Sequence, residues 1–210
     1  MIDTVLFDLD GTLIDSNRLI ITVFKYVFET ELPQFKLTHS DYVRFIGPTL
    51  SQSLVNYVSD EQEIQRLIQV YRKKNIELHD TFVKPFDGAL QLLIELKKRG
   101  IQTGVVSSKM HFLVERGLKV TGLLPYIDII IGMDDVVNHK PHPEPIHKAL
   151  SLFDDFEDAI YVGDHPNDIL AGKAAGIKTI GMNYSWNLED LKATQADYYL
   201  DSLIQILEVI

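Results

Sequence analysis

Apolar and polar residues follow three successive patterns along the chain. The short apolar run Thr4–Phe7 predicts a buried strand that ends at Asp8. From residue 16 to about residue 79, apolar positions recur at helical spacing, and Ser16 is placed to cap the first of these helices. After Pro85, short apolar runs alternate with amphipathic segments that end at glycines. The pattern therefore predicts a helical bundle inserted between a first strand and a series of alternating strands and helices.

The series after Pro85 contains further strands and helices in strict alternation. Strands are predicted at 102–106, 127–131, 159–162 and 178–181, and helices at 87–98 (capped by Asp87), 109–120, 145–153 and 168–175. A strand near 198–200 and a final helix from Ser202 complete it. This order is typical of an α/β fold with a parallel sheet covered by helices on both faces. We therefore expect a Rossmann-like, doubly wound parallel sheet core formed by residues 1–15 and 82–210, with residues 16–81 inserted as an α-helical domain.

Composition limits the classes of function. The chain has 210 residues, of which 46% are hydrophobic and 24% charged, as in folded globular proteins. A formal net charge of −10 argues against sequence-independent binding of nucleic acid, which needs a basic surface. Because the chain has no cysteine, disulfides, thiolate nucleophiles and cysteine metal sites are excluded. No apolar run approaches ~20 residues, so we expect no membrane contact and a cytoplasmic location.

Polar residues follow the ends of several predicted strands. They are Asp8 and Asp10 after the first strand, Ser107 and Asp164 after two later ones, and Lys140 in the loop beyond the third. Ligands of open parallel sheets bind at the carboxyl ends of the strands, so these side chains are expected to converge. Carboxylates suit Mg²⁺, and a hydroxyl with an ammonium suits phosphoryl oxygens. Each residue alone also fits a turn, a helix cap or an exposed lysine, and only their order and position together favour a site.

These residues together resemble the four motifs of the haloacid-dehalogenase-like hydrolase superfamily: Asp8-Leu9-Asp10-Gly11-Thr12, then Ser107, then Lys140-Pro141, then Gly163-Asp164 with Asp168. The resemblance covers essentially the whole chain. It implies that Asp8 is a nucleophile that forms an aspartyl-phosphate and that Asp10 is the general acid and base. It also implies Mg²⁺ bound by the carboxylates of Asp8 and Asp164 and by the backbone carbonyl of Asp10.

The same resemblance implies how the phosphoryl group is held. Ser107 and Lys140 bind it, and Asp168 supports Lys140 or the water around the metal. Gly11 and Thr12 of the first motif, and Ser108 directly after Ser107, are further candidates for substrate binding. The acid at position 10 favours phosphoryl transfer over dehalogenation, because the superfamily's dehalogenases have no alkoxide to protonate and lack this acid.

The inserted segment 16–81 resembles the superfamily's first class of cap domain. Such a cap closes over the site, excludes water and contacts the leaving group. Gly47, in the loop 46–50, is the expected substrate-binding residue of the cap, and a plain turn between helices is the alternative. Several cationic cap residues are candidates for binding a leaving phosphate: Arg18, Lys25, Arg44, Arg72, Lys73 and Lys74.

Within the superfamily, segments of both cap and core resemble PpaX-type pyrophosphatases and phosphoglycolate phosphatases. They are 45–50, Tyr71-Arg72 with Asn75, His79-Asp80, 117–123, 134–136, 140–145 and 168–173. One departure is Ser107-Ser108-Lys109, where those groups usually have Thr, then Thr or Asn, then Lys. The resemblance implies hydrolysis of inorganic pyrophosphate or a small phosphomonoester, with phosphoglycolate phosphatase as the alternative.

Two alternatives come from other functional classes. A β-phosphoglucomutase-like isomerase is disfavoured, because no Gly-x-Ser-Arg-like phosphate clamp follows Gly47. A non-catalytic binding protein on the same scaffold is disfavoured, because no key motif residue is missing. We expect a small phosphorylated substrate as the partner, and a monomer or homodimer.

Overall fold

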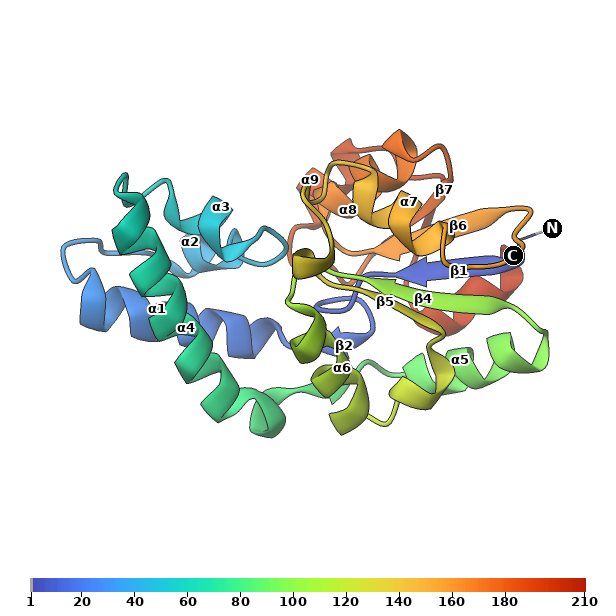
Figure 1. Ribbon diagram of the computed structural model, residues 1–210, viewed down its shortest axis with the longest axis horizontal. Helices are drawn as coiled ribbons and strands as arrows, with labels where there is room; N and C mark the ends of the chain where they lie inside the picture. Colours follow the sequence, from blue (N-terminus) through green and yellow to red (C-terminus); the bar gives the residue numbers. More distant parts are fainter. Residues whose placement is uncertain (1) are drawn as a thin grey trace.

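The computed structural model describes residues 2–210 and contains a six-stranded parallel sheet with helices packed on both of its faces (Figure 1). The strands follow the order β5-β4-β1-β6-β7-β8, and each neighbouring pair is parallel. Their bounds are β1 (Thr4–Phe7), β4 (Gln102–Val106), β5 (Ile129–Ile131), β6 (Ala159–Gly163), β7 (Lys178–Met182) and β8 (Tyr198–Leu200). The chain thus runs outward from β1 in both directions, which places a crevice at the carboxyl end of β1. The predicted doubly wound α/β core is confirmed.

Helices cover both faces of the sheet. In Figure 1, α5 (Ala89–Lys98) and α6 (His111–Val120) lie below the strands, and α7 (Glu144–Leu150) and α8 (Pro166–Ala174) lie above them. The remaining core elements are α9 (Leu188–Ala193) and the 3₁₀ helices Leu124–Tyr126, Met133–Asp135 and Leu203–Glu208. None of the helices described has both the length and the apolar character that a membrane span requires.

Three local predictions differ from the structure. The segment after Ser202 is a 3₁₀ helix and not an α-helix. Helix α5 begins at Ala89, and the residue before it is Gly88 with φ +82°, so Asp87 is not its cap. A left-handed backbone at this position suits glycine. Ser16 does precede the first helix as predicted, but its hydroxyl donates to Asp10 and leaves the helix end uncapped.

A group of helices stands beside the sheet (Figure 1). It comprises α1 (Asn17–Glu31), α2 (His39–Val43), α3 (Leu50–Leu54) and α4 (Glu61–Phe82). The chain enters and leaves it through one short antiparallel ribbon, β2 (Ile14–Asp15) paired with β3 (Lys84–Pro85). Because both connections run through this ribbon, it is a suitable place for a hinge. The division into a cap, 16–81, and a core stays a prediction.

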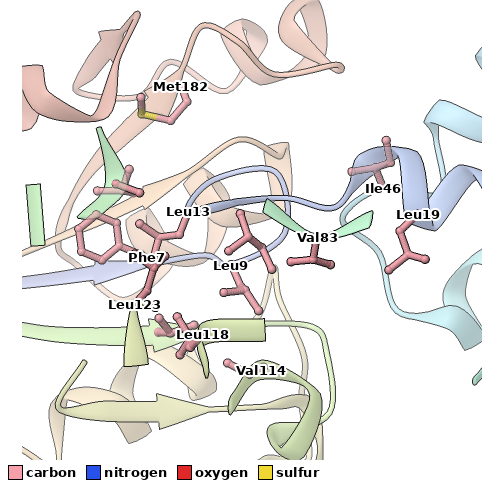
Figure 2. Packing of buried hydrophobic residues seen from close by; sticks show 14 of the residues in the cluster. Phe7, Leu9, Leu13, Leu19, Ile46, Val83, Val114, Leu118, Leu123 and Met182 are labelled. Carbon is pink, nitrogen blue, oxygen red and sulfur yellow. The ribbon is translucent and has the colours of Figure 1, made fainter. Parts of the chain in front are cut away.

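Buried apolar side chains anchor the loop that follows β1. Figure 2 shows Leu9 and Leu13 of this loop among the buried side chains that extend from Phe7 to Leu118. The carbonyl of Leu9 accepts hydrogen bonds from the amides of Leu13 and Ile14, each at 3.0 Å. The backbone on either side of Leu9 is therefore held firmly, and this backbone carries the two aspartates of the first motif.

Candidate active site

Lys140 lies at the centre of the predicted site. Its ammonium donates to Asp8 Oδ1 at 2.7 Å, to Asp168 Oδ1 at 2.6 Å and to the Tyr161 hydroxyl at 2.9 Å. The Tyr161 hydroxyl in turn donates to the Val106 carbonyl at 2.8 Å. Burial alone would lower the pKa of Lys140, but Asp168 and Asp8 outweigh it and hold the pKa well above its ordinary value. Lys140 is only 4% exposed, so the alternative of a surface lysine is wrong.

Asp168 performs two structural tasks at the start of α8. One carboxylate oxygen, Oδ1, accepts from Lys140. The other, Oδ2, accepts from the backbone amide of His165 at 2.9 Å and so belongs to the helix cap. The helix cap therefore fixes the carboxylate that holds Lys140.

Three buried carboxylates, from Asp8, Asp164 and Asp168, have oxygen atoms within 4.8 Å of one another. Within residues 2–210, the ammonium that pairs with these carboxylates is that of Lys140, which leaves two negative charges uncompensated when all three carboxylates are ionised. Burial raises the pKa of Asp8 to about 7, although Lys140 opposes the shift. Burial, followed by repulsion from Asp8, also raises the pKa of Asp164 well above its ordinary value. The site fits a divalent cation, which binds carboxylate oxygens and removes this excess of negative charge.

The turn after β1 is shaped around Asp164. The Thr12 hydroxyl donates to Asp164 Oδ1 at 2.9 Å. Gly11 has φ +89°, and a Cβ atom at this position would overlap the Asp164 carboxylate. Both the backbone conformation and the close approach therefore require glycine. Gly11 and Thr12 lie against this carboxylate and not on the wall of the cavity between sheet and helices. The geometry gives them a role in positioning Asp164, and a direct contact with substrate stays a prediction.

The carboxylate of Asp10 is not part of the cluster formed by Asp8, Asp164 and Asp168. Its Oδ1 accepts from the Ser16 hydroxyl at 2.5 Å and from the Lys109 ammonium at 2.9 Å. The side chain is 16% exposed and lines the cavity. This position suits a group that exchanges protons with a bound molecule.

Ser107 and Ser108 follow β4 and also line the cavity. Ser107 is buried, and its Oγ accepts from the backbone amide of Lys109 at 3.3 Å. Helix α6 begins only at His111, with Met110 before it, so Ser107 is not the cap of this helix. Ser107 and Asp8 line the same cavity.

A cavity of about 90 Å³ lies between the sheet and the helical segment. From the core it is lined by Asp8, Asp10, Ser107, Ser108 and Lys109, and from the helical segment by Gly47, Tyr71, Arg72 and Asn75. The other lining side chains are apolar: Ile20, Phe24, Phe45, Pro48, Leu50, Met110, Leu113 and Met133. The loop containing Gly47 therefore reaches the site, and the alternative of a plain turn between helices is wrong.

The sequence of residues 5–182 matches the haloacid dehalogenase-like hydrolase family. The chain belongs to this family. Pyrophosphatase PpaX of Halalkalibacterium halodurans is 39% identical to it over 100% of this chain and 97% of that protein. Pyrophosphatase PpaX of Bacillus thuringiensis is 41% identical, over 100% of this chain and 96% of that protein. The crystal structure of a haloacid dehalogenase-like hydrolase from Bacteroides fragilis superimposes with a TM-score of 0.91 at 30% identity, covering 98% of this chain and 100% of the other.

In this haloacid dehalogenase-like hydrolase, sequence reasoning missed two residues of the site. Tyr161 lies within β6 and reads as an ordinary buried strand residue, although its hydroxyl contacts Lys140. The sequence indicates Lys109 only as a member of the segment Ser107-Ser108-Lys109. In the structure its ammonium forms an ion pair with Asp10. Tyr161 could have been recognised because it is a tyrosine within an otherwise aliphatic strand, and a buried hydroxyl needs a hydrogen-bond partner.

Proposed function

We propose that this chain is a Mg²⁺-dependent phosphohydrolase that transfers a phosphoryl group first to Asp8 and then to water. The observation that carries the proposal is the contact of 2.7 Å between Lys140 Nζ and Asp8 Oδ1, beside a cluster with two uncompensated negative charges. A carboxylate at the floor of a cavity, next to a fixed ammonium, suits covalent catalysis. The relatives named pyrophosphatase support the same class of reaction.

The reaction has two balanced steps. In the first, an Asp8 carboxylate oxygen bonds to phosphorus while the bond from phosphorus to the leaving oxygen breaks, and the Asp10 carboxyl gives its proton to that oxygen. In the second, Asp10 takes a proton from water, the water oxygen bonds to phosphorus, and the bond from phosphorus to Asp8 breaks. Inorganic phosphate leaves, and both aspartates return to their starting states.

Positioning and charge supply most of the catalysis in phosphoryl transfer. Lys140 and the Ser107 hydroxyl hold phosphoryl oxygens, and Asp168 keeps Lys140 in place through its contact of 2.6 Å. The carboxylates of Asp8 and Asp164 and the backbone carbonyl of Asp10 would hold Mg²⁺, which supplies positive charge to the phosphoryl oxygens. The helical segment excludes water from the cavity when it lies against the core.

The substrate is inorganic pyrophosphate or a small phosphomonoester, with phosphoglycolate as the alternative. The relatives named pyrophosphatase favour the first. The apolar part of the cavity wall favours a leaving group that contains carbon. Since all the motif residues are present and grouped, an isomerase or a non-catalytic protein is not favoured. We also propose a cytoplasmic location and a monomer or homodimer.

Phosphate release from a panel of substrates tests the proposal. The panel contains pyrophosphate, phosphoglycolate, sugar phosphates and an activated aryl phosphate, each with and without EDTA. We expect Mg²⁺, and not Ca²⁺, to restore activity after chelation, because the looser coordination of Ca²⁺ misplaces the reacting groups. Asp8→Asn is the matched control, since an amide of the same shape cannot form the acyl-phosphate. Substantial turnover by pure Asp8→Asn protein, or full activity in chelator, would contradict the mechanism.

A further inference from the structure

Among the cap cations considered for substrate binding, Arg72 alone lines the cavity. Arg18 and Lys73 are exposed on helix faces. The others are engaged elsewhere: Lys25 lies over the Tyr42 ring, Arg44 faces Asp41, and Lys74 pairs with Glu77. The structure thus identifies Arg72 as the one of these six cations that can contact a molecule in the cavity.

Arg72 has no competing partner for its charge. It is half-buried, and its side chain forms no ion pair or hydrogen bond with any of the residues from 2 to 210. The other cation on the cavity wall, Lys109, is already paired with Asp10 at 2.9 Å. An anion that enters the cavity therefore finds its free positive charge on the cap side, at Arg72.

Asn75 lies one helical turn after Arg72, on the same face of α4. It lines the cavity and is only 4% exposed. Within the part of the chain that the structure describes, its Oδ1 atom is buried without a hydrogen-bond partner. A buried polar atom without a partner is costly, and a ligand in the cavity would satisfy it. This is a second observation, independent of the charge of Arg72, that points to a ligand at this wall.

The surroundings of Arg72 and Asn75 limit what the ligand is. Phe24, Phe45 and Leu50 line the cavity from the cap and Leu113 lines it from the core, and none of these side chains offers a hydrogen bond. From the helical segment, the Tyr71 hydroxyl is the one polar side-chain group on this wall besides Arg72 and Asn75, so a sugar with several hydroxyl groups would leave most of them unsatisfied. A short leaving group with one anionic end would not.

We propose that Arg72 and Asn75 form the site for an anionic end of the leaving group. The inference rests on the proposed phosphohydrolase function. The substrates are then compounds that carry a phosphoryl group at one end, a phosphate or carboxylate at the other, and few or no hydroxyls between. Arg72 determines specificity by its charge, and Asn75 positions the same group through its amide.

Matched substrates test the charge. Pyrophosphate and phosphoglycolate have an anionic leaving group, whereas ethyl phosphate, a compound of similar size, has an uncharged one. We expect Arg72→Ala to lower kcat/KM for the two anionic substrates roughly 10- to 100-fold more than for ethyl phosphate, the effect of losing a charge-assisted contact. Arg72→Lys, which keeps the charge, should lose less of the preference for anionic substrates than Arg72→Ala does. Asn75→Asp adds a negative charge without a change in shape, so it should lower kcat/KM for the anionic substrates more than for ethyl phosphate.

Lys73→Ala is the control, because Lys73 is an exposed cation next to Arg72 on the same helix. It should not change the ratio between anionic and neutral substrates. If Arg72→Ala lowers kcat/KM equally for all substrates, Arg72 has only a structural role. If it lowers kcat/KM for none of them, Arg72 does not contribute to binding. Either result would overturn the proposal.

A binding measurement separates this proposal from the proposed reaction. 3-Phosphonopropionate has a P–C bond in place of the scissile bond and a carboxylate at its other end. Propylphosphonate has the same phosphonate but an uncharged methyl group in place of the carboxylate. Calorimetry should show the carboxylate compound binding more tightly to the unaltered protein, and the difference should vanish in Arg72→Ala. If this holds but no phosphate ester is hydrolysed, including the activated aryl phosphate, only the proposed reaction fails. If hydrolysis occurs without any preference for anionic ends, only the present inference fails.

Discussion

Gly47 of the cap lies directly against the imidazole ring of His165, the residue that follows Asp164 in the core. A Cβ atom at position 47 would overlap this ring, and the glycine has φ +105°. The contact joins a loop of the helical segment to the residue beside the carboxylate cluster. Gly47 therefore sets how closely the helical segment approaches the core.

We predict that Gly47→Ala holds the cap away from the core. The change introduces an overlap with His165 and a backbone conformation that alanine rarely adopts. Steady-state kinetics should show a kcat/KM for the preferred substrate lowered by roughly 10- to 100-fold, since misplacement by about 1 Å has this effect on a positioned reaction. An activated aryl phosphate, which depends less on the cap, should lose less.

A second substitution separates the overlap from the backbone strain. His165→Ala removes the ring but also the Nδ1 atom that accepts from the Asn167 amide at 3.1 Å. In the His165→Ala background the overlap is absent, so Gly47→Ala should lower kcat/KM by a smaller factor there than it does in the unaltered protein. If the two effects are simply additive, the contact does not govern cap closure.

Asp10→Asn should reduce activity most where the leaving group is poor. Asp10 lines the cavity, and an amide in its place cannot protonate the leaving oxygen. We expect a loss of roughly 10²-fold or more on an alkyl phosphate and a much smaller loss on an activated aryl phosphate, whose leaving oxygen needs no proton. Comparison of kcat for the two substrates checks this. Equal losses would argue against Asp10 as the proton donor.

The position of the candidate catalytic groups was predictable, because it depends on topology and not on packing. In a doubly wound sheet, residues that end the parallel strands meet at one edge whatever the details of the core. This argument predicts the convergence of Asp8, Ser107 and Asp164, and of Lys140 in the loop beyond the third strand. The structure places all four around one site.

The contacts between these groups and the rest of the protein were not predictable in the same way. Whether the Tyr161 hydroxyl reaches Lys140 depends on the strand register and on the loop that carries Lys140. The six cations of the helical segment looked alike in the sequence. The rotation of α4 about its axis separates Arg72 from Lys73 and Lys74, and the packing of the other helices directs Arg18, Lys25 and Arg44 elsewhere. One signal was overlooked: Tyr71, Asn75 and His79 recur at four-residue spacing and are all buried, which marks a polar stripe on a face that faces the core.

Removal of the Lys140 charge should destabilise the protein more than removal of the Tyr161 hydroxyl. Lys140→Met leaves three buried carboxylates facing one another, and the loss of one partner from a buried ion pair costs about 3–5 kcal/mol. Tyr161→Phe removes one hydrogen bond to Lys140 and one to the Val106 carbonyl, with a cost of about 1–3 kcal/mol. Urea unfolding in EDTA at pH 7.5 measures both. A larger loss in Tyr161→Phe would show that the hydroxyl, and not the charge, holds the cluster.

The stability of the metal-free protein should fall as pH rises toward 7, and Mg²⁺ should reverse this. The pKa of Asp8 is raised in the fold from 3.8 to about 7, with burial as the main cause. Between these values the folded protein binds more protons than the unfolded chain, so the free energy of unfolding falls with pH and levels off above about 7. Mg²⁺ needs the carboxylate, and protons compete with it below that value. The gain in melting temperature from saturating Mg²⁺ should therefore be small at pH 5, grow through pH 6 and 7, and be largest at pH 8.

Asp8→Asn is the control, because it has no carboxyl to titrate at this position. Its stability in EDTA should fall less as pH rises, and its gain in melting temperature from Mg²⁺ should be smaller. A gain in the unaltered protein that is the same at every pH, or largest at pH 5, would show that Asp8 does not take part in binding the metal.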